Sequence, residues 1–531
     1  MSAEATPLDV PADNRRIFKS HPLLMVVILT IASFMEILDS GIANVALPNI
    51  AGNLSITPEE ASLVTSSYLV ANTVIVPITG WLAIYFGRKR LYLTCVAIFI
   101  AASFMCGVST SLGMLVFFRI IQGLAGGNLV VIEQAFIVDS VPAEQRGMAF
   151  SIYGATIVCA PIFAPALGGW LTDTYSWHWV FFINVPIGLL SLFLVSRFVI
   201  EPKSTIEERK KVRASGQRVD WVGILLITMG IAALTIVLDK GNHEDWFESN
   251  FIITFAIIAF VALLFGVTWE LTQENPAVDI RLLGNRSIGA GAIVVFVIAV
   301  MIYGTSVLTP LFAQQMLGFS AQDSGMINTA GGIVSLIMMP IAGFLMKKMD
   351  ARYLAIAGLS LAALGLWSLT NLNPDAGYWD LALRRALQTF AGAFLFAPVM
   401  AAAFRGVPDG KADSASSLIT TSAGLGGSFG IALLTMLLAD KTKYHVGILS
   451  EQASDYNPNY ITWLDRATQA LQDKGMSAVE AASAARGMMW SEINRQAGML
   501  AFIDTFYIMM ILVVGAIPLI FLFKAGVGKK K

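Results

Sequence analysis

Four ionisable side chains interrupt long apolar stretches of the sequence: Glu36, Asp39, Arg119 and Glu133. On insertion scales, an ionisable group in a membrane-spanning helix costs about 2.5–3.5 kcal/mol, which makes it a functional candidate by default. Glu36 and Asp39 are three residues apart and share one helix face. Burial favours the protonated acid, whereas a neighbouring Arg favours the carboxylate. Residues of these types could therefore bind and release a proton.

The depth of each group follows from its position along its apolar run. At about 1.5 Å per residue, Asp39 lies roughly 13 Å from Pro48, and Arg119 lies roughly 9 Å from Gly113 on the same side of the membrane. The acid and the Arg are nearly level and are predicted to pair. Glu133 lies some 30 Å along its run, which predicts a place near the cytoplasmic mouth.

This geometry suggests a proton-coupling mechanism. If Asp39 and Arg119 pair in only one access state, protons load on one side of the membrane and unload on the other. Under this hypothesis Asp39 carries the proton, Arg119 sets its proton affinity, and Glu36 shares the proton or meets a substrate. Two alternatives stay open: a static ion pair that holds two helices together, and, for Glu133, a carboxylate that snorkels or faces the cytoplasm.

Other polar side chains within the apolar runs predict the lining of a cavity. Tyr68 and Asn72 are four residues apart on one helix face, and Gln122 follows Arg119 by about one turn. Among Met, Phe, Ile and Val neighbours, such residues indicate an apolar pocket with few polar anchors. The alternative for each is a hydrogen bond to a neighbouring helix. The candidates are Tyr68, Asn72, Gln122, Gln314, Gln315 and Asn328.

Spanning helices must position these groups. Only 13% of the 531 residues are charged and 56% are hydrophobic, whereas a soluble domain has roughly 25% charged residues. Runs of about 20 apolar residues, the length that crosses a bilayer, recur fourteen times. They lie near residues 23–47, 60–84, 90–109, 113–139, 147–171, 178–197, 219–239, 250–270, 286–313, 323–346, 353–371, 381–404, 414–440 and 499–524.

The remaining composition narrows the class further. A net charge of −1 gives no sign of a nucleic-acid partner, and the three Cys and four His residues form no disulfide or metal pattern. We expect no cofactor, with protons as the coupling ion. Lys and Arg concentrate in alternate loops, which predicts cytoplasmic termini.

The predicted organisation has six parts. They are a cytoplasmic N-terminus (1–22), a six-helix bundle (23–200), a cytoplasmic linker (201–218), two inserted helices (219–270), a second six-helix bundle (286–524) and a cytoplasmic tail (525–531). The second bundle includes a periplasmic loop, 441–498, in which Ser477 and Glu480 form a capping box. We expect a short hairpin of amphipathic helices there, on the membrane surface or against a partner.

An internal repeat supports this organisation. The sequence Pro-Ile-Thr-Gly-Trp-Leu at 77–82 returns as Pro-Ile-Ala-Gly-Phe-Leu at 340–345, and Arg-Ile-Ile-Gln at 119–122 returns as Arg-Ala-Leu-Gln at 385–388. The displacements are 263 and 266 residues, in the same order. Ordinary helix packing does not explain that shared order. The repeat predicts an all-α membrane protein of the major facilitator fold, two six-helix bundles plus two inserted helices, with a site between the bundles.

The motifs resemble those of the 14-spanner drug:proton antiporters of the major facilitator superfamily, most closely the EmrB-type proteins of Gram-negative bacteria. The resemblance rests on residues 38–48, 80–89, 119–123, 160–169 and 177–186, and it runs over essentially the whole chain. It assigns proton coupling to Asp39 and Arg119. It assigns conformational roles to Gly80, Gly87, Arg88, Lys89, Pro161, Pro165, Gly168 and Gly169.

Two positions depart from the family's motifs. Ile84 stands where the motif between the second and third helices has an Asp, so this residue cannot supply the expected charged latch to the second half. Ala164 stands where the antiporter motif has a Gly. This change still leaves a small side chain for close helix packing.

The resemblance implies an antiporter, not an enzyme, that exports hydrophobic drugs and toxic compounds across the bacterial inner membrane by alternating access. It also implies a tripartite pump with a periplasmic membrane-fusion adaptor (EmrA-type) and a TolC-like outer-membrane channel, with loop 441–498 as the adaptor contact. Two alternatives stay open. One is a proton-coupled uptake symporter of a small metabolite, and the other is a membrane-embedded enzyme such as an acyltransferase.

Overall fold

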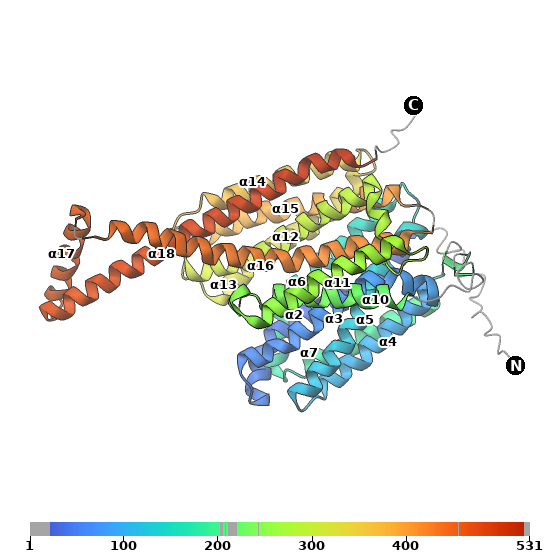
Figure 1. Ribbon diagram of the computed structural model, residues 1–531, viewed down its shortest axis with the longest axis horizontal. Coiled ribbons are helices and arrows are strands. Elements are labelled where there is room, and N and C mark those ends of the chain that lie inside the picture. The colour runs from blue at the N-terminus through green and yellow to red at the C-terminus, as the bar shows by residue number, and fades with distance from the viewer. Residues whose placement is uncertain are drawn as a thin grey trace.

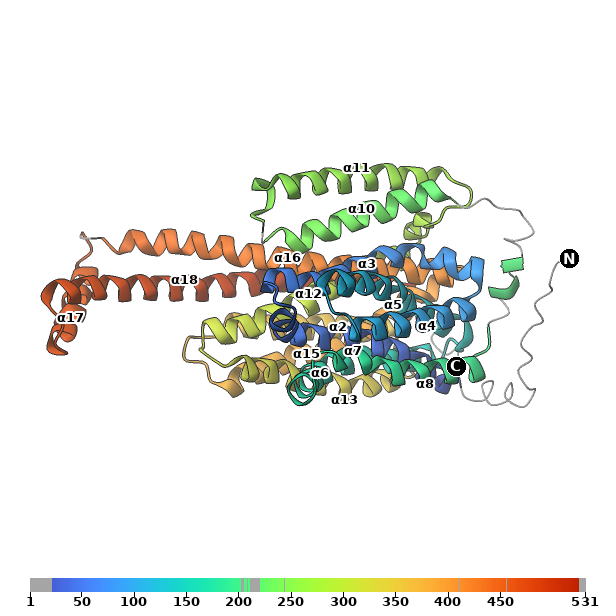
Figure 2. The same ribbon diagram turned by 90° about the horizontal axis from the view of Figure 1, so that it is seen from below.

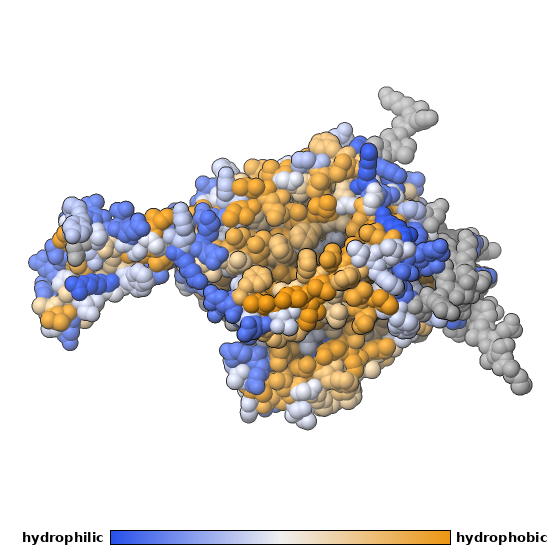
Figure 3. Space-filling view, in the orientation of Figure 1, coloured by the Kyte–Doolittle hydropathy of each residue, from blue (hydrophilic) through white to orange (hydrophobic). Residues whose placement is uncertain are grey.

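The computed structural model describes residues 22–524, apart from 202–204, 208, 211–219, 243, 409 and 455. The predicted N-terminal segment, most of the linker 201–218 and the tail 525–531 lie outside the described residues. Within the described part, fourteen helical segments are long and apolar enough to cross a membrane, which confirms the predicted count. The space-filling view shows a broad hydrophobic band across this face of the bundle, with hydrophilic residues towards both ends (Figure 3).

The first half of the chain forms one bundle. Its helices are α2 (Pro22–Leu54), α3 (Pro58–Phe86), α4 (Arg88–Gly107), α5 (Leu112–Ser140), α6 (Arg146–Thr174), α7 (Trp179–Phe182) and α8 (Asn184–Phe198). Local sequence fixes where they begin: Thr57 caps α3 in a capping box with Glu60. Pro186 lacks the N–H that would continue the helix, and the sixth span breaks at Ile183, between α7 and α8.

The second half forms a similar bundle of α12 (Arg286–Gln315), α13 (Ala321–Leu345), α14 (Ala351–Thr370), α15 (Tyr378–Ala403), α16 (Ala412–Gln452) and α18 (Ala478–Ala516). Between the halves in sequence lie α10 (Trp221–Lys240) and α11 (Asn250–Thr272). These two helices pack on each other, and α10 also packs on α3 and α16. Figure 2 shows the pair along one side of the molecule. The arrangement is the predicted major facilitator fold with two added helices.

Segment 441–498 forms a hairpin of helices, as predicted, but the hairpin is long and projects from the bundle (Figure 1). Helix α16 has 41 residues and α18 has 39, so α16 is about 60 Å long, twice the thickness of a bilayer core. Both helices run out of the bundle without a break and are joined by α17 (Pro458–Asp473) (Figure 1). The predicted capping box of Ser477 and Glu480 starts α18. We call this projection, residues 441–498, the hairpin.

The repeated Pro-x-x-Gly motifs meet the opposite half of the molecule. A Cβ on Gly80 of α3 would lie 3.0 Å from the backbone oxygen of Asp413 on α16. A Cβ on Gly343 of α13 would lie 2.9 Å from Ser151 on α6. Both glycines lie towards the ends of their helices that are remote from the hairpin, which we call the Arg88 end. The repeat therefore permits close approach of the two halves at that end.

Thiol labelling tests the orientation. In a background with Cys95, Cys106 and Cys159 replaced by Ala, we expect Val479→Cys in the hairpin to react with an impermeant maleimide on spheroplasts. Val479 is 81% exposed. Lys348→Cys, at the Arg88 end, should react only after lysis, because basic loops stay in the cytoplasm. Labelling of Lys348→Cys on intact spheroplasts would show the reverse orientation.

Candidate functional site

The predicted pair of Asp39 and Arg119 is present in the core of the first bundle. Arg119 Nη1 lies 2.5 Å from Asp39 Oδ2, and both side chains are fully buried. The other carboxylate oxygen, Oδ1, accepts hydrogen bonds from Gln122 Nε2 at 2.9 Å and Asn184 Nδ2 at 2.6 Å. All three neighbours donate. This arrangement is built to hold the ionised carboxylate.

The Arg is held by further contacts. Its Nε donates to the backbone oxygen of Val64 at 3.1 Å, and its guanidinium carbon lies 4.1 Å from the centre of the Tyr68 ring. Its Nη2 is completely enclosed and has no hydrogen-bond partner among the described residues. The position of Arg119 is therefore fixed by α2, α3 and its own helix α5, leaving one donor unused.

Glu36 forms a second acidic site beside the first. Its Oε1 accepts hydrogen bonds from Tyr68 Oη and Asn72 Nδ2, both at 2.9 Å, which unites three predicted residues. Its Oε2 makes no hydrogen bond to a described residue, and the side chain is 7% exposed. Tyr68 bonds Glu36 through its hydroxyl and stacks on Arg119 through its ring, so it connects the two acidic sites.

Glu133 lies at the predicted depth along α5, but neighbouring helices enclose it. It is 1% exposed and accepts hydrogen bonds from Ser33 Oγ at 2.6 Å and Tyr92 Oη at 3.4 Å. The depth along α5 is as counted, but neighbouring α2 and α4 cover that face of the helix. Glu133 is therefore an enclosed group of the first bundle rather than a carboxylate at the cytoplasmic mouth.

The remaining cavity candidates lie in two different places. Asn328 on α13 accepts a hydrogen bond from Arg385 Nε at 2.9 Å and donates to the backbone of Ser306. Gln314 and Gln315 are instead exposed at the last two positions of α12. The structure does not bring these two residues to the other candidates, because α12 ends there.

Several polar residues at the site were not assigned a role from the sequence. Asn184 reaches Asp39 because the break between α7 and α8 positions it, and Ser103 Oγ accepts its second hydrogen bond at 2.9 Å. Across the bundle interface, Tyr303 of α12 is half exposed and lies within electrostatic reach of Glu36. A lone polar residue in an apolar run was the available signal for Asn184 and Tyr303.

A buried charged cluster connects the halves at the Arg88 end. Arg88 Nε and Nη2 donate to the two carboxylate oxygens of Asp413 at 2.8 and 2.7 Å, and Nη2 also lies 2.9 Å from Asp139. Nearby, Ser417 Oγ donates to backbone oxygens of α3. A charged contact between the halves is therefore present although position 84 is an Ile, because Asp413 and Asp139 supply the carboxylates. We call Arg88, Asp139 and Asp413 the clamp.

Comparison with known proteins decides the family. Residues 29–431 match the family model described as Major Facilitator Superfamily. The chain belongs to this superfamily. Within it, the chain is 37% identical over 437 residues to the Multidrug export protein EmrB of Haemophilus influenzae, covering 82% of this chain and 84% of that protein. It is 36% identical to the EmrB of Escherichia coli K12, with the same coverage. It is therefore an EmrB-type transporter of the major facilitator superfamily.

Other relatives are consistent with this assignment. The Fatty acid resistance protein FarB of Neisseria gonorrhoeae is 32% identical over 496 residues, or 93% of this chain and 95% of that protein. Among solved structures, the proton:xylose symporter XylE matches with a TM-score of 0.58 at 16% identity, over 81% of this chain and 90% of that chain. The human organic anion transporter MFSD10 matches with a TM-score of 0.58 at 13% identity, over 94% and 99%. These two structures support the fold.

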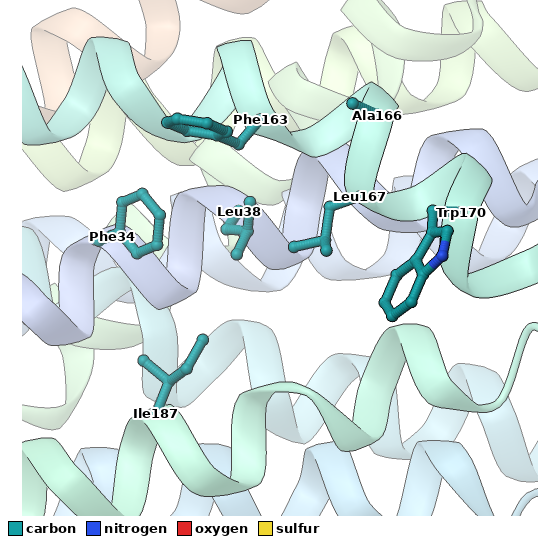
Figure 4. Close-up of a pocket in the computed structure, with 7 residues that line it drawn as sticks. All are labelled: Phe34, Leu38, Phe163, Ala166, Leu167, Trp170 and Ile187. Atoms are coloured by element: carbon teal, nitrogen blue, oxygen red, sulfur yellow. The ribbon is translucent and has the colours of Figure 1, made fainter.

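The described residues also form an apolar pocket. It opens between α2, α6 and α8 and is lined by Phe34, Leu38, Phe163, Ala166, Leu167, Trp170 and Ile187 (Figure 4). Phe163 and Trp170 are more than half exposed. The pocket contains no charged side chain, so it offers hydrophobic contact but no site for a proton.

The clamp gives a prediction for stability and accessibility. Asp413→Asn leaves Arg88 buried without its bidentate partner, and removing one partner of a buried ion pair costs about 3–5 kcal/mol. We expect a lower unfolding temperature in detergent. We also expect Ser417→Cys, protected in the parent, to become reactive from the Arg88 end.

Asp139→Asn is the matched control for this experiment. Asp139 is 14% exposed and meets one nitrogen of Arg88, whereas Asp413 is fully buried and meets two. We therefore expect a smaller loss of stability and continued protection of Ser417→Cys. Equal protection in both variants would contradict the role of the clamp in closing this end.

Proposed function

We propose that this chain is a proton-driven antiporter that exports hydrophobic compounds from the cytoplasm by alternating access. The observation that carries the proposal is the enclosed Asp39 carboxylate, held by Arg119, Gln122 and Asn184. Burying an ionisable side chain in a membrane-spanning helix costs free energy, so such a residue is a functional candidate by default. The export direction is supported by the similarity to the Multidrug export proteins EmrB.

In the proposed cycle the residues have separate tasks. Asp39 releases its proton when Arg119 and the two amides surround it, and it takes up a proton when the helices that carry these donors separate. Glu36 has a free oxygen, which can accept a proton or a polar group of the substrate. Tyr68 touches both sites, so a change at one alters the other.

The clamp provides the conformational half of the cycle. The Arg88 end is proposed to be cytoplasmic, because Lys and Arg concentrate in its loops. The clamp, together with Ser417, closes the halves at that end. Substrate arrives from the cytoplasm only when this end opens, and the hairpin end lies on the periplasmic side, where export ends.

The hairpin is proposed to contact a membrane-fusion adaptor (EmrA-type) that leads to a TolC-like channel. In support, the hairpin projects from the bundle as two continuous helices and places α17 at its tip. The proposed location is the inner membrane, with the lipid bilayer around the hydrophobic band.

Replacing Asp39 by Asn tests proton coupling. In inverted vesicles an acid interior should drive accumulation of a hydrophobic dye by the parent. We expect Asp39→Asn to lose this gradient-driven uptake, because the amide cannot carry a proton, while dye counterflow without a gradient continues. Counterflow shows that the variant is folded and still binds the dye.

Two other results would redirect the proposal. Gradient-driven uptake that survives in Asp39→Asn rejects this residue as the carrier, and Glu36→Gln is the next variant to measure. Dye release rather than uptake on acidification of the interior favours the uptake symporter. Asn371→Ala, on an exposed residue at the end of α14, is the neutral control.

A further inference from the structure

The second bundle contains a copy of the Asp39–Arg119 arrangement in which the acid is missing. Arg385 and Gln388 on α15 repeat the Arg and Gln of α5 at a displacement of 266 residues. At the same displacement, Thr305 of α12 occupies the position that Asp39 holds in the first half. Each half therefore has an Arg at the equivalent position, but the first half has an Asp where the second half has a Thr.

The hydrogen bonds confirm that the two arrangements correspond. Gln388 Nε2 donates to Thr305 Oγ1 at 3.0 Å, as Gln122 Nε2 donates to Asp39 Oδ1 at 2.9 Å. Arg385 Nη1 donates to Gln388 Oε1, as the Arg of the first half does to its own Gln. A neutral hydroxyl thus stands in the second half where the first half has a carboxylate.

Arg385 consequently lacks a counter-charge. The side chain is 5% exposed, and its contacts with Asn328 and Gln388 are with neutral amides. None of the described acidic residues forms an ion pair with it. Its Nη2 makes no hydrogen bond to a described residue, and unlike Nη2 of Arg119 it is not completely enclosed. A buried cation without a partner is costly, and this one keeps a donor free.

We infer that Arg385 binds the anionic head of the transported compound, with Asn328 and Gln388 orienting the guanidinium. The ligand class is a hydrophobic molecule with one oxyanion, such as a long-chain carboxylate. A guanidinium with a free donor fits an oxyanion through charge-assisted hydrogen bonds. Because Thr305 carries a neutral hydroxyl, the substrate supplies the negative charge that an Asp at this position would supply. This inference rests on the proposed export function and adds a substrate class to it.

Two matched amphiphiles test the inference: dodecanoate and dodecyltrimethylammonium, which share a chain length and differ in charge. Binding to the purified full chain is measured in nanodiscs of neutral phosphatidylcholine. We expect Arg385→Gln and Thr305→Asp each to weaken dodecanoate binding about tenfold or more. The first removes the cation and the second neutralises it internally. Binding of the cationic probe should change less than twofold.

Two conservative variants complete the design. Thr305→Ser keeps the hydroxyl, and Arg385→Lys keeps the charge, so both should retain the preference for the anionic probe. Thermal unfolding identifies any variant that fails to fold. If either Arg385→Gln or Thr305→Asp fails to fold, the dodecanoate binding of the other variant decides the test. A second set of nanodiscs with phosphatidylglycerol separates substrate from lipid, because a lipid phosphate at this site should compete with dodecanoate in the parent.

The inference is overturned if both variants bind dodecanoate as the parent does, if they lose both probes alike, or if the parent binds no dodecanoate. It is also overturned if Arg385 affects only phosphatidylglycerol binding. These outcomes are separate from failure of the proposed antiport, because binding is measured without a proton gradient. Loss of coupling in the Asp39 experiment would leave the binding result unchanged.

Discussion

The ion pair of Asp39 and Arg119 is the constraint around which the first bundle is arranged. Two full charges lie where water cannot solvate them, so every available oxygen and most of the nitrogens must be satisfied by protein groups. Gln122 of α5, Asn184 of α8, and a backbone oxygen and an aromatic face of α3 meet this demand. A movement of any of these helices would change the groups that surround the carboxyl group, and the proposed antiport cycle depends on such a change.

The pairing was predictable from sequence because depth along an unbroken helix is a matter of counting residues. The same count placed Glu133 correctly along α5 but could not show that Ser33 and Tyr92 enclose it, since rotation and neighbours are tertiary properties. Asn184 escaped assignment for a related reason. Its approach to Asp39 depends on the break before α8, and a helix break positions a side chain in a way that regular periodicity does not describe.

The clamp was beyond sequence reasoning because its partners are far apart in the chain. Arg88 and Asp413 are 325 positions apart, and no local pattern connects them. The family's motif has an Asp at position 84, but this chain has an Ile, so there was no reason to expect a charged contact there. The sequence predicted a helical hairpin at 441–498 but not the length of its helices. Hydropathy ends a span where polar residues begin, but a helix continues as long as nothing breaks it. Element count and fold class followed from composition and repeat, whereas element length did not.

Helix α16 ties the clamp to the hairpin. Asp413 lies in its first turn, Ser417 and Thr420 contact the first half nearby, and the same helix continues to Gln452 inside the projection. An uninterrupted helix of this length behaves as a stiff rod. In the proposed cycle, a rotation of α16 as the clamp opens would therefore displace the tip of the hairpin over a larger distance than the clamp itself. A partner bound at that tip would then move with each opening and closing of the clamp.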